Sequence, residues 1–321
     1  MLQTGDILVP RYENRDFLEK PPLTWWVIAA SYRLLGASPF AERLPSVLAA
    51  FAAIALTGLW VRRRSGTEAG VLAALVLTFT LQFSVYARTF AADSFLTLAV
   101  ILAAIALDEA CRREGPDARL GILAGAALAL AFGIKGLVGI ALPAGGVAAG
   151  LLIDRTRAVR PMKRGAWAAA ALLLPLAAWH LAMTQRMGVG FWRSFYWENH
   201  FLRGATKLYM GTPRGPLFYL GAFAWSAFPW SLLLAAAAGR KATGVRRRSS
   251  LPLGLFLFGF LFFSLLVMKR EVYLMPLFPA AAVLLAEGMT REPASDSRWR
   301  RLPWLLAAAI PAAAVFFWGR G

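Results

Sequence analysis

Two carboxylates beside cations are the side chains of this sequence best suited to catalysis. Glu19 and Lys20 are adjacent and precede two prolines, and Asp93 follows Arg88 by five residues. A carboxylate can take a proton from a hydroxyl group, and a neighbouring cation can stabilise a developing negative charge. Simpler interpretations remain open, namely a solvated ion pair at Glu19 and Lys20 and a helix N-cap at Asp93.

Two further segments place cations close to apolar runs. Lys135 stands in a short turn between two such runs, where an ammonium group is either paired or extended to the membrane surface. Lys269, Arg270 and Tyr273 lie together in "MKREVYLMP". These positions therefore add candidate ligands for an anionic group.

The segment 185–215 is the richest in polar and aromatic side chains. It contains His200, and it places Arg203 and Lys207 four residues apart, on one face of a helix. Two cations at that spacing suit a phosphate group. The aromatic side chains favour a helix at the membrane surface, so this segment is predicted to lie next to lipid headgroups.

The composition indicates that these candidate residues belong to a membrane protein. The 321-residue chain is 59% hydrophobic and only 16% charged, whereas soluble domains carry about a quarter charged residues. The net charge of +18 could indicate nucleic-acid binding, but the basic residues stand in short clusters between apolar runs, which excludes that class. Cys111 is the single cysteine, so no intrachain disulfide is expected.

Ten apolar runs are candidates to cross about 30 Å of hydrocarbon. The predicted fold is an all-α polytopic membrane protein with about ten transmembrane helices and interfacial helices in its extracytoplasmic loops. Two GxxxG pairs, Gly121/Gly125 and Gly146/Gly150, predict closely packed helices. The predicted spans are 45–61, 69–86, 94–110, 120–134, 137–153, 166–184, 216–238, 251–268, 272–288 and 302–318.

Clusters of Lys and Arg alternate with the other loops and predict the orientation. By the positive-inside rule the basic loops are cytoplasmic. They comprise residues 62–64, 112–119, 155–164, 240–248 and 291–301. The extracytoplasmic set is then 1–44, 87–93, the turn at 135, 185–215 and 269–271. All the candidate residues above fall in this second set, so the site is predicted on the outer face.

The first 44 residues are predicted to form an extracytoplasmic loop, followed by a membrane core at 45–318. The segment 23–35 is apolar, begins near the pair Trp25 and Trp26, and is too short to span, so an interfacial helix is expected. The loop must be translocated, yet it has neither a charged nor an apolar signal region. We therefore expect a membrane helix upstream of Met1.

Five motifs in order resemble those of a known superfamily. They are "TGDILVPRYENRDFLEKPPLTWW" with "ASPFAERLPSVL", then "YARTFAADSFLT", "GIKGLVGIALP", "FWRSFYWENHFLRG" and "KREVYLMPLFP". The sequence is similar to the lipid A 4-amino-4-deoxy-L-arabinose transferases and the protein O-mannosyltransferases of the GT-C glycosyltransferases. The resemblance extends over roughly residues 1–290, although its motifs do not distinguish the sugar or the acceptor.

The resemblance implies an integral membrane glycosyltransferase of the bacterial inner membrane with its active site outside. It would move a sugar from a polyprenyl-phosphate donor, of the undecaprenyl-phosphate type, to a lipid such as lipid A or to a protein, with inversion. Its partners would be this donor, the acceptor and membrane lipids, and not nucleic acid.

Roles for individual residues also follow from the resemblance. Glu19 and Asp93 would be the catalytic carboxylates, and Glu19 with His200 could bind a divalent metal ion. The family's Asp-Glu motif is expected upstream of Met1, and Asp6 does not match it. The substrate-binding residues would be Lys20, Arg88, Lys135, Arg203, Lys269 and Tyr273.

Two other functions remain as alternatives. A transporter of polyprenyl-linked glycans predicts polar residues deep within the spans. A non-catalytic or degenerate polyprenyl-lipid-binding protein predicts the same outer-face residues without sugar transfer. A transfer assay separates the second alternative from an enzyme.

Overall fold

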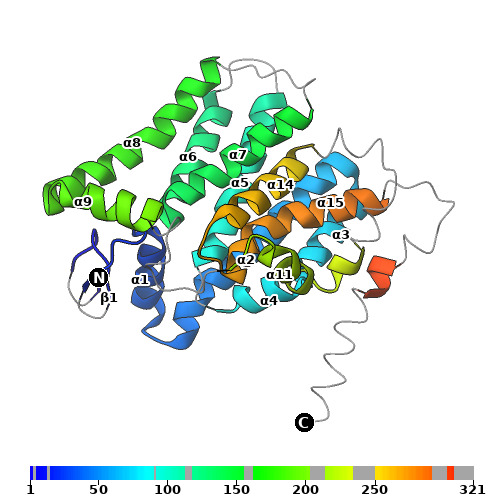
Figure 1. Cartoon of the computed structure of the whole chain (residues 1–321), viewed down its shortest axis with the longest axis horizontal. Helices are drawn as coiled ribbons and strands as arrows, with labels where there is room; N and C mark the ends of the chain where they lie inside the picture. The colour runs from blue at the N-terminus through cyan, green and yellow to red at the C-terminus, as the bar shows by residue number, and fades with distance from the viewer. Residues whose placement is uncertain are drawn as a thin grey trace, which may run out of the picture.

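The computed structural model describes residues 1–2, 5–12, 15–89, 92–112, 118–154, 162–202, 214–233, 250–290 and 302–306. Within these ranges the chain is a bundle of helices with one small hairpin near the N-terminus (Figure 1). The strands β1 (Arg11–Tyr12) and β2 (Arg15–Asp16) pair antiparallel, with Arg11 opposite Asp16. The helices are α1 (Leu23–Leu35), α2 (Pro39–Ser65), α3 (Thr67–Thr78), α4 (Leu81–Ala87), α5 (Ala92–Arg112), α6 (Ala118–Lys135), α7 (Leu137–Ile153), α8 (Met162–Met187), α9 (Gly190–Trp192), the π-helix η1 (Arg193–Leu202), α11 (Phe218–Ser226), α14 (Ser250–Leu265), the 3₁₀ helix η2 (Glu271–Leu277) and α15 (Phe278–Thr290).

The limits of the longest helix, α2, follow from its sequence. The Ser38 hydroxyl accepts a hydrogen bond from the backbone N–H of Ala41 at 3.2 Å, and proline follows at the first helical position. Three arginines occupy the last turn, where the helix dipole favours positive charge. Gly66, with φ of 93°, ends the helix. The 27 residues of α2 extend over about 40 Å, enough to cross a bilayer.

The predicted span 69–86 is broken, in contrast to the expectation of one continuous helix. Its two parts, α3 and α4, meet at Phe79 and Thr80 with a bend of 66°. The Thr80 hydroxyl donates to the Val76 carbonyl at 2.7 Å, and the Ser84 hydroxyl donates to the Thr78 carbonyl. At the break, these two carbonyls lack the backbone hydrogen bonds of a continuous helix, and the hydroxyl groups replace those bonds. The break therefore leaves no unpaired carbonyl at these two positions, which a membrane interior would penalise.

Two other predicted spans also differ from single helices. Helix α11 ends at Ser226, and a turn at 227–229 that includes Pro229 interrupts the span predicted at 216–238. The span predicted at 272–288 begins with the 3₁₀ helix η2, which contains Pro276, before α15. Among the described residues four helices are long and apolar enough to cross a membrane, or five if α3 and α4 count as one span.

Glycines allow the closest helix contacts, as the GxxxG pairs predict. Helix α7 packs on α14, and a Cβ atom on Gly254 would lie 2.3 Å from the backbone nitrogen of Gly150. Helix α6 packs on α8, and a Cβ atom on Gly125 would lie 2.1 Å from the Ala168 carbonyl oxygen. Both contacts bring backbones together, which is the usual way that membrane helices associate.

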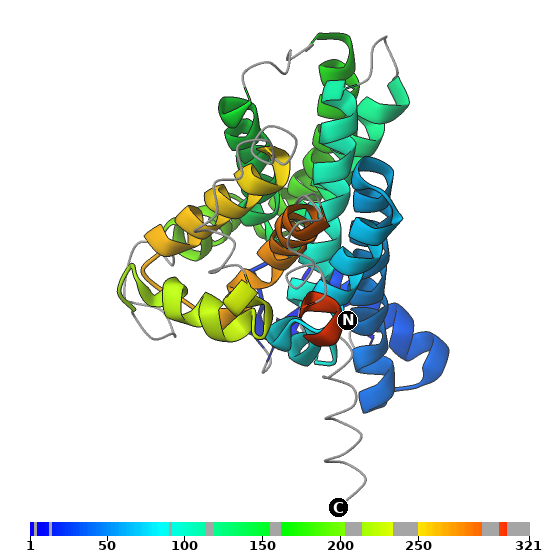
Figure 2. The same cartoon turned by 90° about the vertical axis from the view of Figure 1, so that its right-hand side faces the viewer.

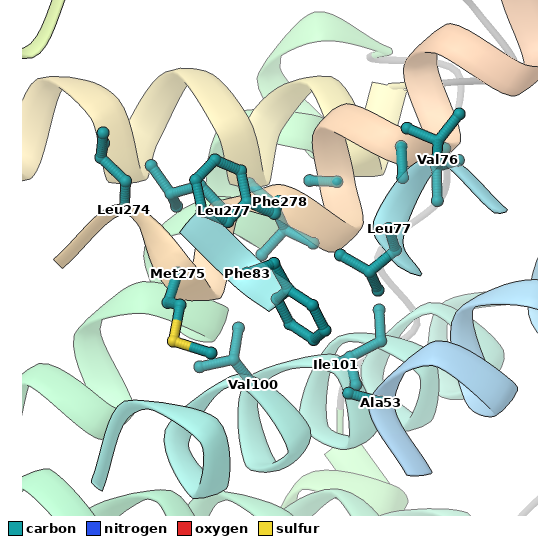
Figure 3. Close-up of a cluster of buried hydrophobic side chains, with 14 of the residues drawn as sticks. Ala53, Val76, Leu77, Phe83, Val100, Ile101, Leu274, Met275, Leu277 and Phe278 are labelled. Carbon is teal, nitrogen blue, oxygen red and sulfur yellow. The ribbon is translucent and has the colours of Figure 1, made fainter. Parts of the chain in front are cut away.

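The main hydrophobic core lies around η2 and the start of α15. Figure 3 shows Met275 and Phe278 converging with Phe83 of α4 and Ile101 of α5. Figure 2 shows α15 between the early helices on one side and α14 on the other. This placement fixes η2, the segment just before α15 that carries Tyr273, against α5.

A second, smaller hydrophobic cluster joins the N-terminal segment to α6 and α8. It contains Val9, Phe132, Phe191 and Phe195 as buried members. The indole N–H of Trp26 donates to the Ile7 carbonyl at 2.6 Å, which joins α1 to the same segment. The expected helix at 23–35 is confirmed as α1.

Candidate functional site

An ion pair joins the first turn of α5 to the last residue of α6. The Lys135 ammonium group donates to a carboxylate oxygen of Asp93, and each side chain is only 12% exposed. An ammonium group at this depth is costly without a partner, so pairing explains how α6 can end on a lysine. Of the two interpretations of Lys135, the structure therefore shows the paired one.

An aromatic ring covers the same lysine from η2. The Lys135 nitrogen lies 4.6 Å from the centre of the Tyr273 ring, a cation–π distance. The Tyr273 ring also contacts that of Phe263 in α14, with centroids 5.7 Å apart. Asp93, Lys135 and Tyr273, predicted from three separate motifs, thus lie together. We call them the outer triad, after the side of the membrane on which the charge pattern predicts them.

His200 lies next to the outer triad, at the turn between α6 and α7. Its Nδ1 bonds to the Phe195 carbonyl at 2.6 Å, which places the proton on Nδ1. Its Nε2 accepts the backbone N–H of Leu137 at 3.3 Å. Gly136, with φ of 60°, leaves room for the ring, because a Cβ atom there would lie 2.2 Å from Nε2.

These bonds bear on the predicted metal site at Glu19 and His200. Both ring nitrogens of His200 contact the main chain, so neither points a lone pair at an open position. Within the described part of the chain no three His, Cys, Asp or Glu side chains form a ligand set. As described, the residues around Glu19 and His200 therefore do not supply a ligand set for a divalent metal ion.

Glu19 and Lys20 are half-buried at the turn that precedes α1. Pro21 and Pro22 are buried and fix this turn. Leu23, the first residue of α1, packs on Gly133 of α6, where a Cβ atom would lie 3.0 Å from the leucine side chain. The turn therefore approaches α6 two residues before Lys135.

Arg88 and Lys269, two further predicted substrate-binding residues, both donate hydrogen bonds to main-chain carbonyls. Arg88 is exposed, and its Nε donates to the Ser84 carbonyl at 3.1 Å, in its own helix. Lys269 is 4% exposed and donates to the carbonyls of Leu266 and, at 3.0 Å, of Arg214. Burial lowers the pKa of Lys269. Within the described residues neither side chain bonds to the outer triad.

The remaining candidates in the segment 185–215, Arg203 and Lys207, lie outside the described residues. Sequence analysis missed Asp6 as a structural residue. Its carboxylate pairs with Arg186 at 2.8 Å, and this contact joins the first loop to the end of α8. It also missed Tyr219, whose hydroxyl donates to the Arg270 carbonyl at 3.1 Å. No local pattern marks Tyr219, because its partner lies 51 residues away.

Residues 19–182, just over half of the chain, match the family model described as dolichyl-phosphate-mannose-protein mannosyltransferase. The chain belongs to this family. The match includes Glu19, Lys20, Asp93 and Lys135, so it covers the first part of the site. The family assignment agrees with the resemblance seen in the five motifs.

This chain is similar to curated relatives over most of its own length. It is 32% identical over 300 residues to the undecaprenyl phosphate-alpha-4-amino-4-deoxy-L-arabinose arabinosyl transferase of Pseudomonas aeruginosa, covering 91% of this chain and 53% of the relative. It is 31% identical over 293 residues to the corresponding transferase 1 of Sodalis glossinidius, covering 89% and 52%. The chain therefore spans about half the length of these relatives.

The fold also matches that of a solved crystal structure. The crystal structure of ArnT from Cupriavidus metallidurans bound to undecaprenyl phosphate superposes with a TM-score of 0.82 at 22% identity. The superposition covers 98% of this chain and 57% of ArnT. This likeness confirms the predicted class, an all-α polytopic membrane protein.

Proposed function

We propose that this chain forms the membrane core of a glycosyltransferase that takes its sugar from a polyprenyl-phosphate donor. The acceptor would be a lipid, such as lipid A, or a protein. The observation that carries the proposal is the outer triad, which holds a nearly buried cation beside a carboxylate and an aromatic ring. The names of the relatives make undecaprenyl-phosphate 4-amino-4-deoxy-L-arabinose the first donor to test.

Each charged group at the site would have a separate role in the transfer reaction. Lys135 would bind the donor phosphate. Asp93 accepts a hydrogen bond from Lys135 and would hold the lysine side chain in place. Glu19 would take the proton of the acceptor hydroxyl. The acceptor oxygen would bond to the anomeric carbon, while the bond from that carbon to the phosphate oxygen breaks. The leaving phosphate keeps the electron pair next to the ammonium group.

The proposed location is the bacterial inner membrane with the site facing outside. The family and the fold establish a membrane protein, and the distribution of basic clusters supports this orientation. We also propose that residues 1–44 form the first outer loop and 45–318 the membrane core.

The buried charges do not favour a transporter. The five buried charged residues described are Asp93, Asp108, Asp154, Lys269 and Glu287. Each lies within about one helical turn of a helix end rather than at a midplane, where a transported polar substrate would bind.

The test is sugar transfer by the purified protein in nanodiscs, with Lys135→Met and Asp93→Asn as variants. We expect both substitutions to lower the transfer rate at least a hundredfold, since each removes part of the phosphate-binding pair. The double variant should lose little more than either single variant, because the two side chains act as one unit. Arg33→Gln is the control, as this cation is exposed in the last turn of α1 and belongs to no predicted part of the site.

Transfer at the unsubstituted rate by Lys135→Met would refute the assigned role of the triad. Binding of undecaprenyl phosphate without any transfer, under conditions that support transfer by a relative, would instead favour a lipid-binding protein.

A further inference from the structure

One carbonyl oxygen at the outer end of the bundle receives two hydrogen bonds. The hydroxyl group of Tyr219 donates to the Arg270 carbonyl at 3.1 Å, and the backbone N–H of Tyr273 donates to the same oxygen at 3.1 Å. Arg270 is the last extended residue before η2, so its carbonyl determines where the first turn of η2 begins. Tyr219 therefore connects α11 to the turn that carries Tyr273.

The Tyr219 side chain is well fixed to hold this carbonyl. It is completely buried, and its ring packs near those of Phe260 and Phe263, with centroids 6.4 and 6.3 Å away. Phe263 is also the ring that contacts Tyr273. A buried phenol keeps its hydrogen-bond partner because water cannot replace it.

We propose that Tyr219 is a positioning residue of the site, whose hydroxyl fixes the Arg270 carbonyl and thereby holds the Tyr273 ring against Lys135. A cation–π contact depends on where the ring lies relative to the cation, here 4.6 Å from nitrogen to ring centre. The part of the inference that concerns the ligand rests on the proposed function, since Lys135 is assigned there to the donor phosphate.

Other contacts join the same two segments and do not depend on the hydroxyl. Lys269 donates to the Arg214 carbonyl at 3.0 Å, and Arg214 pairs with Glu271 at 3.7 Å. The backbone N–H of Arg214 also donates to the Val267 carbonyl, at 3.4 Å. Because these contacts remain, Tyr219→Phe is expected to fold, with its ring packing intact and only the turn loosened.

The first measurement needs no ligand. Hydrogen exchange of the Tyr273 amide should become about fivefold faster in Tyr219→Phe, because that amide bonds to the carbonyl that the hydroxyl fixes. The control is Thr57→Val, which removes another buried hydroxyl bond, 2.7 Å to Ala53 within α2, and should leave Tyr273 exchange unchanged. Unchanged Tyr273 exchange in Tyr219→Phe, or an equal acceleration in the control, overturns the proposal.

The second measurement is affinity for undecaprenyl phosphate in nanodiscs. We expect Tyr219→Phe to weaken binding about fivefold. In a protein that already carries Tyr273→Leu, and so lacks the ring, adding Tyr219→Phe should weaken binding no further. A merely structural role would instead give independent, multiplicative effects, and that result overturns the proposal. If the unsubstituted protein does not bind the lipid, the proposed function fails, while the exchange of the Tyr273 amide still decides the positioning role.

Discussion

Lys135 and Lys269 show how the surroundings of a lysine decide its role. The sequence predicts both as substrate-binding residues near helix ends. Lys135 meets a carboxylate and an aromatic ring, so its charge stays at the site. Lys269 follows the end of α14 and bonds to carbonyls, which is how helix ends are often capped. Only the placement of partners separates the two lysines.

Asp6 is a second residue whose role comes from a distant partner. Burial by itself raises its pKa, but hydrogen bonds from the backbone N–H groups of Val9 and Leu8, and the charge of Arg186, together bring the pKa below its ordinary value of 3.8. The folded protein therefore prefers the ionised carboxylate, and the contact stabilises the first loop on α8.

This shift predicts a pH-dependent stability difference. A lowered pKa gives stability that is present above the unfolded pKa, near 3.8, and is lost as pH falls through the folded pKa. Asp6→Asn should therefore melt at a lower temperature than the unsubstituted protein at pH 7, and this difference should shrink as pH drops below about 4. Melting curves in detergent measure it. A difference that stays constant from pH 7 to pH 3 would contradict the assignment.

At the scale of elements, the π-helix η1 explains how His200 reaches the α6–α7 turn. In η1 the side chains of Asn199 and His200 bond to the carbonyls of Ser194 and Phe195, each five residues earlier. A π-helix is wider than an α-helix, and short π segments are frequent at functional sites. Sequence analysis predicted a helix here, and periodicity gave no reason to expect this wider form.

The contact between α7 and α14 gives a prediction for a whole helix pair. Gly254→Ala should destabilise the protein by about 1–3 kcal/mol, because its Cβ atom would lie 2.3 Å from a backbone nitrogen of α7 that cannot move alone. Gly221→Ala is the matched control in α11, where nothing lies within 4 Å of the new Cβ atom. There alanine should be neutral or slightly stabilising. Equal melting temperatures for the two variants would show that this close contact does not matter.

At the scale of the whole molecule, ion pairs join segments that charge patterning assigns to the same side. At the inner ends of three helices, Arg64 bonds to Asp108 at 3.2 Å and lies 3.7 Å from Glu287. At the outer ends, Asp6 pairs with Arg186, and Arg214 pairs with Glu271. Each contact lies within one set of helix ends, so the contacts agree with the predicted division of the ends into two sides.

Cysteine labelling can test the orientation. In a Cys111→Ser background, Thr89→Cys at the outer end of α4 should react with a membrane-impermeant maleimide in cells with a permeabilised outer membrane. Arg63→Cys, at the inner end of α2, should react only after the inner membrane is opened; both native side chains are exposed. The reverse labelling pattern would refute the assigned topology.

The sequence by itself determined the membrane class and most helix positions. Hydropathy and charge clusters act locally along the chain, so they can be read without the fold. The same holds for the glycines Gly125, Gly146 and Gly150, whose spacing marks packed faces. Three of the predicted candidates, Asp93, Lys135 and Tyr273, then meet because their helices end on one side.

Only the tertiary structure decided which of the candidates lie together. The break between α3 and α4, the π form of η1 and the capping role of Lys269 depend on hydroxyl and carbonyl groups of specific neighbours. Tyr219 joins the site through a carbonyl 51 residues away in the chain. Hydrogen bonds reach about 3 Å and depend on angle, so no pattern of residue types along the chain can specify them.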